Sequence, residues 1–254
     1  MLYGLYVSAA GMAAQETRQS VLSNNLANAQ TNGFKRDLAV MQARNNAVHE
    51  DFQMMKYAIP ILNNQGGGVD LANGGIDLQQ AALVNTTNPT DLALDGKGFF
   101  TVQGDKPGNK LLTRNGEFLI NPDGLLVTAA GRPVLSADGQ TIPLNKSLPF
   151  TVSSSGHISQ GDGASVQLGL TNVTDSRHLI KLGNNLLTVD KPDSLQPVPT
   201  ETQVRQKTLE SSGVDPIVEM VNMMEGQRVF EANAKMISYQ DTTLSELNTV
   251  GKIA

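Results

Sequence analysis

Apolar residues recur at helical spacing at both ends of the chain, whereas short apolar runs separated by turn residues fill the middle. Near the start, from Leu2 to Met12 and again from Leu22 to Ala29, they follow three- and four-residue steps, which is the spacing of one helix face. Asn32-Gly33 then predicts the end of the helix, because glycine accepts the left-handed conformation found there. Glycines inside this helix, each costing roughly 1 kcal/mol against alanine, make it marginal on its own.

A longer helix is predicted at the other end, beginning near Ser212 to Pro216 and running to about Val250. Pro216 suits the first helical turn, and Asp215 is a plausible cap before it. The stripe along this helix is close to a heptad seam and consists of Val229, Ala232, Met236, Tyr239, Thr243, Leu247 and Val250. Chain ends are usually poorly ordered, so apolar ends suggest that they meet each other or neighbouring subunits.

The middle of the chain, from Ala81 to about Pro199, is predicted to be β-structure. Asp-Gly pairs that favour tight hairpin turns recur at residues 95–96, 123–124, 138–139 and 162–163. Phe99 and Phe100 should alternate faces, one in the core and the other near an interface. Residues 35–80 show a weak pattern with glycine clusters, which indicates a linker with short extended pieces. The fold class is therefore α+β.

Composition narrows the classes of function. The net charge of −5 gives no support for nucleic-acid binding, and the lack of cysteine excludes disulfide scaffolds, thiol enzymes and cysteine-based zinc sites. No apolar run reaches the roughly eighteen residues of a membrane span, so membrane insertion is not expected. The first basic residue is Arg18, and without a positive n-region a cleaved secretory signal peptide is not expected.

Candidate catalytic, metal or cofactor residues are not supported by their spacing. Asp91 and Asp95 are interpreted as turn and capping residues beside Gly96. No helix with Lys-Ser/Thr follows Gly98, so a phosphate-binding loop is not expected. The histidines are widely separated and give no metal or acid–base motif: His49, His157 and His178. We therefore expect no enzyme activity, no metal and no cofactor.

Three sequence segments resemble the rod proteins of the bacterial flagellar basal body, a family related to the hook protein. The first contains Asn24-Asn25-Leu26-Ala27-Asn28 and Thr31-Asn32-Gly33-Phe34-Lys35-Arg36. The second contains Asn88-Pro89, Asp91-Leu92-Ala93-Leu94, Gly96-Lys97-Gly98-Phe99-Phe100 and Thr113-Arg114-Asn115-Gly116. The third contains Val214-Asp215, Glu219-Met220-Val221 and Gln227-Arg228-Val229-Phe230-Glu231. They occur in order and span nearly the whole chain, which makes the resemblance specific.

The resemblance implies a discontinuous coiled-coil domain formed by the N- and C-terminal helices, with a central all-β domain. Residues 1–45 would form the N-terminal half of this inner domain and residues 201–254 the C-terminal half. Residues 46–80 would be a Gly-rich extended linker, and residues 81–200 the β-rich middle domain. The helices would line the channel of a hollow tube, with the β domain as its outer layer.

The implied function is that of a structural subunit of the rod, which crosses the periplasm and transmits torque from motor to hook. Subunits would leave through the flagellar type III export apparatus without a cleaved signal. Implied partners are copies of the same chain, other rod and hook proteins, the export apparatus and, through a bushing contact, the basal-body rings.

Residues at the subunit interface are expected on both apolar stripes and in the motifs. The side chains of Asn24, Asn25 and Asn28 can be interpreted in two ways: they form hydrogen bonds between subunits, or they lie in a frayed helix end that faces water. The resemblance favours the first interpretation. Arg228 has a local alternative too, because it can pair with Glu231 on the helix surface. The candidates are Leu22, Asn24, Asn25, Leu26, Asn28, Phe34, Val218, Val221, Met224, Arg228, Phe230, Met236, Tyr239 and Leu247.

Other readings of the sequence are a hook or hook-junction subunit, an extracellular β module that binds a polymer such as peptidoglycan, and a β-rich hydrolase. The absence of a catalytic motif argues against the hydrolase. A polymer-binding module would not need paired apolar ends.

Overall fold

The structure is a computed structural model, and its chain divides into two compact units. The helical unit comprises Met1–Ala27, Asp37–Gly75 and Pro216–Ala254, and the β unit comprises Asn28–Arg36 and Ile76–Asp215. The described residues are 2–43, 68–72, 74–105, 109–161, 165–191 and 194–251.

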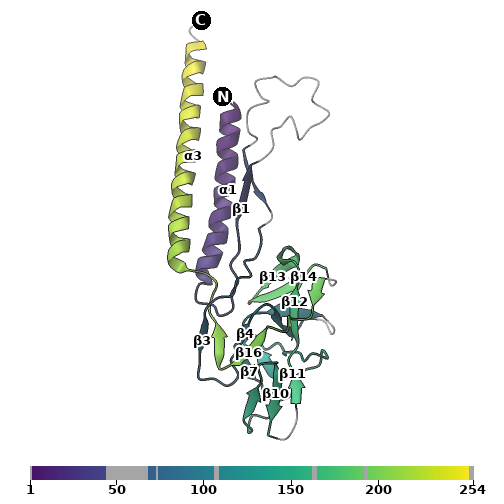
Figure 1. Ribbon diagram of the computed structural model, residues 1–254. Helices are drawn as coiled ribbons and strands as arrows, with labels where there is room; N and C mark the ends of the chain where they lie inside the picture. Colours follow the sequence, from purple (N-terminus) through teal and green to yellow (C-terminus); the bar gives the residue numbers. More distant parts are fainter. Residues whose placement is uncertain are drawn as a thin grey trace. The chain divides into compact units, whose positions relative to one another are not determined.

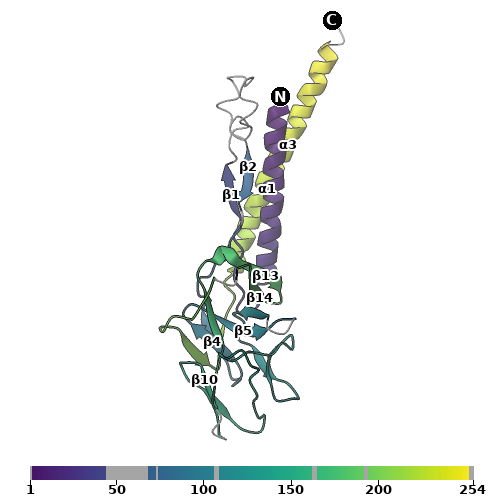
Figure 2. The same cartoon turned by 90° about the vertical axis from the view of Figure 1, so that its right-hand side faces the viewer.

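Two long helices dominate the helical unit: α1 spans Leu2–Ala27 and α3 spans Pro216–Gly251. Both were predicted, and Pro216 occupies the first position of α3, where its missing N–H is tolerated. After α1 the chain turns, and Gly33 adopts a φ of +68°, the left-handed conformation expected there. The helices lie side by side and run in opposite directions (Figures 1 and 2).

A short hairpin packs beside α1 within the helical unit. Strands β1 (Val40–Ala43) and β2 (Val69–Ala72) pair antiparallel, and β2 contacts α1. The expected linker over residues 46–80 therefore contains a strand at its end, while residues 46–67 lie outside the described residues. Leu38 N–H donates to the Gly75 carbonyl at 2.8 Å and closes the hairpin base.

Antiparallel strands build the β unit. Within its described residues, a six-stranded sheet has the order β13-β14-β6-β5-β12-β15, beside a three-stranded sheet β11-β10-β9 and the pairs β16-β4, β17-β3 and β7-β8. The strand bounds are β3 Leu83–Asn85, β4 Leu92–Asp95, β5 Phe99–Gln103, β6 Lys110–Thr113, β7 Phe118–Ile120, β8 Leu126–Thr128, β9 Phe150–Val152, β10 His157–Gln160, β11 Ser165–Gln167, β12 Leu170–Val173, β13 Leu179–Gly183, β14 Leu186–Val189, β15 Leu195–Gln196, β16 Gln203–Gln206 and β17 Thr208–Glu210. A 3-10 turn, Ser176–His178, precedes β13.

Two of the predicted Asp-Gly hairpin turns are present, at residues 123–124 between β7 and β8 and at residues 138–139 between the bridged residues Leu135 and Thr141. Residues 95–96 instead connect β4 to β5, which pair with other strands. Gly96, Gly124 and Gly139 all have positive φ, at 120°, 79° and 78°, which an L-residue with a Cβ rarely adopts. The fourth pair, at 162–163, lies outside the described residues. The hairpin between β13 and β14 turns at Asn184 and Asn185, whose φ values of 50° and 57° match a type I′ turn.

The core of the β unit has two parts, one on each face of β5. Phe100 packs edge-on against Phe118, with ring centroids 5.2 Å apart, at the centre of the larger cluster. Phe99 lies in a second cluster with Leu112 and Leu187. The expectation that one of these phenylalanines would lie near an interface is wrong, because both faces of this sheet are covered within the β unit and both rings are buried.

The β unit extends beyond the predicted β segment in both directions. Strand β16 pairs with β4 and β17 pairs with β3, so residues 203–210 complete sheets instead of joining the C-terminal helix. Residues 28–36 also belong to the β unit. The reason is backbone pairing: Gly33 N–H donates to the Glu210 carbonyl at 2.7 Å, and Gly213 N–H donates to the Phe34 carbonyl at 2.9 Å.

Candidate assembly surfaces

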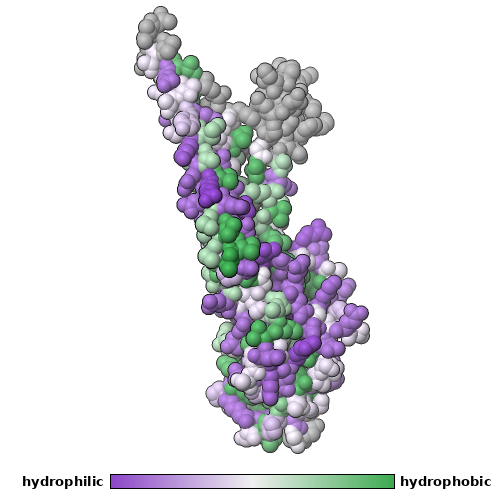
Figure 3. Space-filling view, turned by 60° about the vertical axis from the view of Figure 1, so that its left-hand side comes forward, coloured by the Kyte–Doolittle hydropathy of each residue, from purple (hydrophilic) through white to green (hydrophobic). Residues whose placement is uncertain are grey.

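The surface of α3 carries large apolar side chains that are exposed in the described chain. Tyr239 is 69% exposed and Met236 is 51% exposed. Figure 3 shows hydrophobic surface, in green, on the α3 side of the helical unit. The exposed apolar residues of this helix are Ile217, Val218, Met220, Val221, Met224, Val229, Met236, Tyr239 and Leu247. Large exposed apolar side chains that gather along one helix in this way indicate an interaction site.

The face of α3 that meets α1 is a different one. Gly226, Asn233 and Gln240, spaced by seven residues, face α1. Met236 follows Asn233 by three residues, which at 3.6 residues per turn rotates it by about 60° from the contact line. The part of the stripe that contains Met236 therefore does not form the contact with α1, and the sequence had left open whether the stripe meets the first helix or a neighbouring subunit. Coiled-coil pairing through that stripe remains a proposal.

Most of the predicted interface residues on the C-terminal helix are exposed. They are Val218, Val221, Met224, Arg228, Met236, Tyr239 and Leu247, while Phe230 is half-buried. Beside Arg228, the carboxylate of Glu231 accepts a hydrogen bond from Gln227 at 3.5 Å. Because they are exposed, the seven predicted interface residues can contact another chain.

The predicted interface residues near the end of α1 lie in several environments. Leu22 is buried, Leu26 and Asn28 are half-buried, and Asn24 is exposed. Asn25 is only 1% exposed, and its amide exchanges two hydrogen bonds of 3.0 Å with the backbone of Asp37. The amide of Asn25 thus joins two parts of the same chain, in place of the intersubunit role that the sequence suggested.

Phe34, another predicted interface residue, makes its contacts within the same chain, inside the β unit. Its ring is buried, and the Lys181 ammonium lies 4.1 Å from the ring centroid. The same ammonium donates to the Lys35 carbonyl at 2.6 Å. The Asn185 amide donates to the Asn32 carbonyl at 2.8 Å. The motif Thr31–Arg36 therefore serves to attach the segment after α1 to the strands of the β unit.

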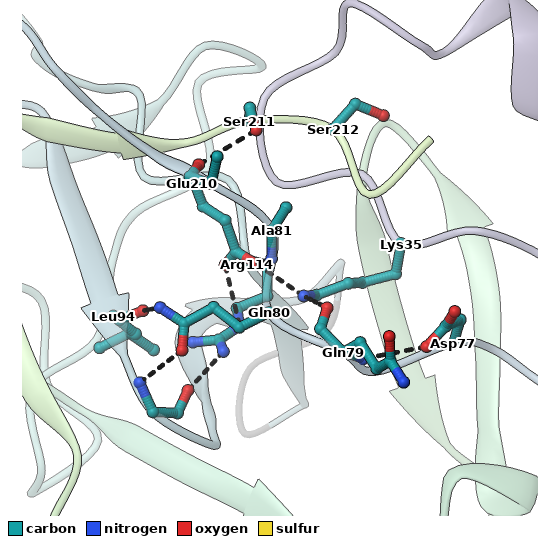
Figure 4. A network of polar contacts seen from close by, with 12 residues as sticks. Lys35, Asp77, Gln79, Gln80, Ala81, Leu94, Arg114, Glu210, Ser211 and Ser212 are labelled. Carbon is teal, nitrogen blue, oxygen red and sulfur yellow. Dashed lines mark hydrogen bonds and ion pairs between the residues drawn. The ribbon is translucent and has the colours of Figure 1, made fainter. Parts of the chain in front are cut away.

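A buried ionic cluster lies next to this motif (Figure 4). Lys35 Nζ is 2.7 Å from Glu210 Oε1, and Arg114 Nε is 3.3 Å from Glu210 Oε2. Glu210 Oε1 also accepts the Ala81 N–H at 2.9 Å, and Lys35 Nζ donates to the Gln79 carbonyl at 2.7 Å. One carboxylate therefore connects the motif after α1, the strand before α3 and the end of β6.

Burial dominates the electrostatics of this cluster. Loss of water lowers the pKa of Lys35 below its ordinary value, and the charge of Glu210 opposes that shift. Burial likewise lowers the pKa of Arg114, again opposed by Glu210. Both cations therefore depend on one carboxylate, because an uncompensated buried charge is strongly unfavourable.

Sequence reasoning quoted some of these residues without assigning them a role. Lys35 and Arg114 lie in the recognised motifs, but their shared partner Glu210 is 175 residues from Lys35 and no local pattern links them. The contact residues Asn233 and Gln240 were not predicted, because they are polar and the helical periodicity was defined by apolar positions. Their seven-residue spacing with Gly226 was the signal that could have identified them.

Other kinds of site find little support in the described part of the chain. Its His, Asp and Glu residues form no group of three that could hold a metal ion. None of its helices is long and apolar enough to cross a membrane. What the geometry does provide is contact surface on α3.

Comparison with known families adds three matches in chain order. The model described as "Flagella basal body rod protein" matches residues 5–35. The model "Flagellar hook protein FlgE/F/G D1 domain" matches residues 93–160, and "Flagellar basal body rod FlgEFG protein C-terminal" matches residues 205–250. The first and last cover most of α1 and α3, and the second lies within the β unit.

Curated relatives match over almost their full length. The flagellar basal-body rod protein FlgF of Caulobacter vibrioides is 34% identical, over 98% of both chains. The rod protein FlgG of Buchnera aphidicola is 33% identical, over 98% of this chain and 99% of the relative. FlgG of Bacillus subtilis is 30% identical, over 97% of this chain and 98% of the relative. With identities of this size over whole chains, this protein belongs to the family of flagellar basal-body rod proteins.

Proposed function

We propose that this chain is a structural, non-catalytic subunit of the flagellar basal-body rod. The observation that carries the proposal is the apolar surface of α3, which stays exposed although α1 lies against the same helix. Burying it in an assembly would remove apolar area from water, at about 25 cal/mol per Å². Full-length similarity to proteins named as rod proteins supports the same conclusion.

The mechanism is head-to-tail association that does not close, which generates a helical tube. The exposed stripe of α3 packs against helices of neighbouring copies as a coiled-coil inner layer around a channel, and the β unit forms the outer layer. Torque passes from motor to hook through these contacts. The partners are copies of this chain and other axial proteins, with the type III export apparatus delivering subunits and the basal-body rings surrounding the rod in the periplasm.

The competing functions fit less well. The relatives reported above are named as rod proteins, which favours the rod over the hook. A polymer-binding β module would have no use for the long apolar surface of α3.

The test is a charge placed on this surface in a strain that lacks the native gene. We expect Met236→Asp to abolish rod completion and swimming, because a carboxylate in a buried interface is costly. Ser238→Asp, on another face of the same helix and also exposed, is the matched control and should swim. Motility assays and electron microscopy of basal bodies give the readout, and circular dichroism of the purified variants checks the fold.

Normal rods with Met236→Asp would count against the proposal. An equal defect with Ser238→Asp would also count against it, because the effect would then not belong to the apolar surface.

A further inference from the structure

The contact between α1 and α3 is made by glycines facing amide side chains. A Cβ built on Gly4 would lie 2.7 Å from Gln240 Nε2, and one on Gly11 would lie 3.0 Å from Asn233 Nδ2. On the other helix, a Cβ on Gly226 would lie 3.4 Å from Gln15 Oε1. The amides of Gln240 and Asn233 thus occupy space that a side chain at Gly4 or Gly11 would otherwise fill, whereas a Cβ at Gly226 would be in ordinary van der Waals contact.

Two of these pairs follow one antiparallel register. Moving seven residues forward from Gly4 to Gly11 on α1 corresponds to moving seven residues back from Gln240 to Asn233 on α3. The contact of Gly226 with Gln15 lies about one helical turn off this line, because Gly226 is seven residues before Asn233 whereas Gln15 is only four residues after Gly11. The register is therefore defined by the two glycines of α1 and the two amides of α3.

A shift by one heptad would break this complementarity in either direction. Shifted one way, Gly11 would face Gly226 and leave a gap that no side chain fills. Shifted the other way, Asn233 would face Arg18 in place of a glycine. Only the observed register places an amide of α3 opposite each of the two glycines of α1.

This contact is specific but not strong. Gln15 Oε1 and Gln240 Oε1 are buried and have no hydrogen-bond partner among the described residues, and a buried unsatisfied acceptor is unfavourable. Glycine inside a helix is also unfavourable. A polar residue at a coiled-coil contact position is known to specify register while lowering stability.

We propose that two glycine–amide pairs, Gly4 with Gln240 and Gly11 with Asn233, fix the antiparallel register of α1 against α3 within the single chain. The side of α3 that carries these amides meets α1, which leaves Met236 and Tyr239 outside the intrachain contact. The use of Met236 and Tyr239 by a second copy rests on the proposed rod function, whereas the register itself does not.

Engineered disulfides can read the register directly, because the chain contains no cysteine. Ser8 lies between the two glycines of α1, and Ile237 lies between Asn233 and Gln240; both are half-buried. The in-register pair is Ser8→Cys with Ile237→Cys. The shifted pairs use Phe230→Cys or Leu244→Cys with Ser8→Cys. One heptad is about 10 Å along a helix, whereas the Cα atoms of a disulfide are usually less than about 7 Å apart.

In the otherwise unchanged, full-length purified chain, mild oxidation should cross-link Ser8→Cys with Ile237→Cys and leave the shifted pairs almost unlinked. Adding Asn233→Leu and Gln240→Leu should remove this preference, so that shifted cross-links become comparable in yield. Gln227→Leu, at an exposed amide on the same helix, is the matched control and should keep the preference. Mass spectrometry of peptides quantifies each cross-link.

Equal cross-linking of all three pairs in the unchanged chain would overturn the proposal, and so would an unaltered preference after both leucine substitutions. The first measurement needs only the cysteine pairs, so it decides the question even if the leucine variant misfolds. Because the assay uses the isolated chain, correct register with normal rods in Met236→Asp would refute the proposed function and leave this inference standing.

Discussion

Glu210 joins three segments of the β unit that are far apart in the sequence. It is 2% exposed and lies between Lys35 and Arg114, with the Ala81 N–H as a further donor. The motifs that contain Lys35 and Arg114 could be recognised from the sequence, but their roles could not. A pairing across 175 residues leaves no local signal, because it depends on the folding of every segment between.

We expect Glu210→Gln to destabilise the β unit by about 3–5 kcal/mol, because two buried cations would lose their counter-charge. Asp95→Asn is the control: its ion pair with Arg205 is exposed to solvent, and such pairs contribute about 0–1 kcal/mol. Urea denaturation followed by circular dichroism measures both. Equal stability of the two variants would show that the buried cluster contributes no more than a surface pair.

At the scale of elements, the periodicity of apolar residues predicted both helices well but did not predict β16 and β17, the last two strands before α3. The predicted helix from Leu2 to Ala29 ends at Ala27, and the predicted start near Pro216 is correct. Strands β16 and β17 were missed because each offers only one strongly apolar residue, Val204 or Leu209. Their pairing with β4 and β3 comes from strands about a hundred residues earlier.

Gly226 lies inside α3, where helix propensity predicts the effect of a substitution on stability. Gly226→Ala should raise the thermal stability of the helical unit by up to about 1 kcal/mol, the difference in helix propensity. The added methyl would meet Gln15 Oε1 at 3.4 Å, which is ordinary van der Waals contact. Thermal unfolding followed by circular dichroism tests this, and a lower midpoint would show that the side chain of Gln15 cannot adjust.

At the scale of the whole molecule, the two units differ in how they bury their surfaces. The β unit buries two apolar clusters, whereas the helices meet through glycines and amides and leave apolar residues exposed. Composition and periodicity indicated this division into α and β parts. They placed its boundaries differently, because residues 28–36 and 203–210 are held by long-range backbone pairing.

Limited proteolysis should therefore cleave the helices before the β unit. We expect trypsin to cut early at Lys235 in α3 and late at Arg205 and Lys207, although all three side chains are exposed. The backbone around Arg205 and Lys207 is held by β16 and β17, and protection from cleavage follows local stability. Mass spectrometry over time identifies the cuts; simultaneous cleavage at the three sites would contradict the expected difference.

If the chain is exported as proposed, and enters the export channel N-terminus first, the late strands have a kinetic consequence. Strands β3 and β4 cannot find their partners until residues 203–210 have left the channel, and Lys35 must wait for Glu210. Contacts so distant in sequence slow folding. The β unit would thus complete its sheets only after most of the polypeptide has crossed. Until then it would remain incompletely folded, and the rest of the chain could still pass through the channel as an extended polypeptide.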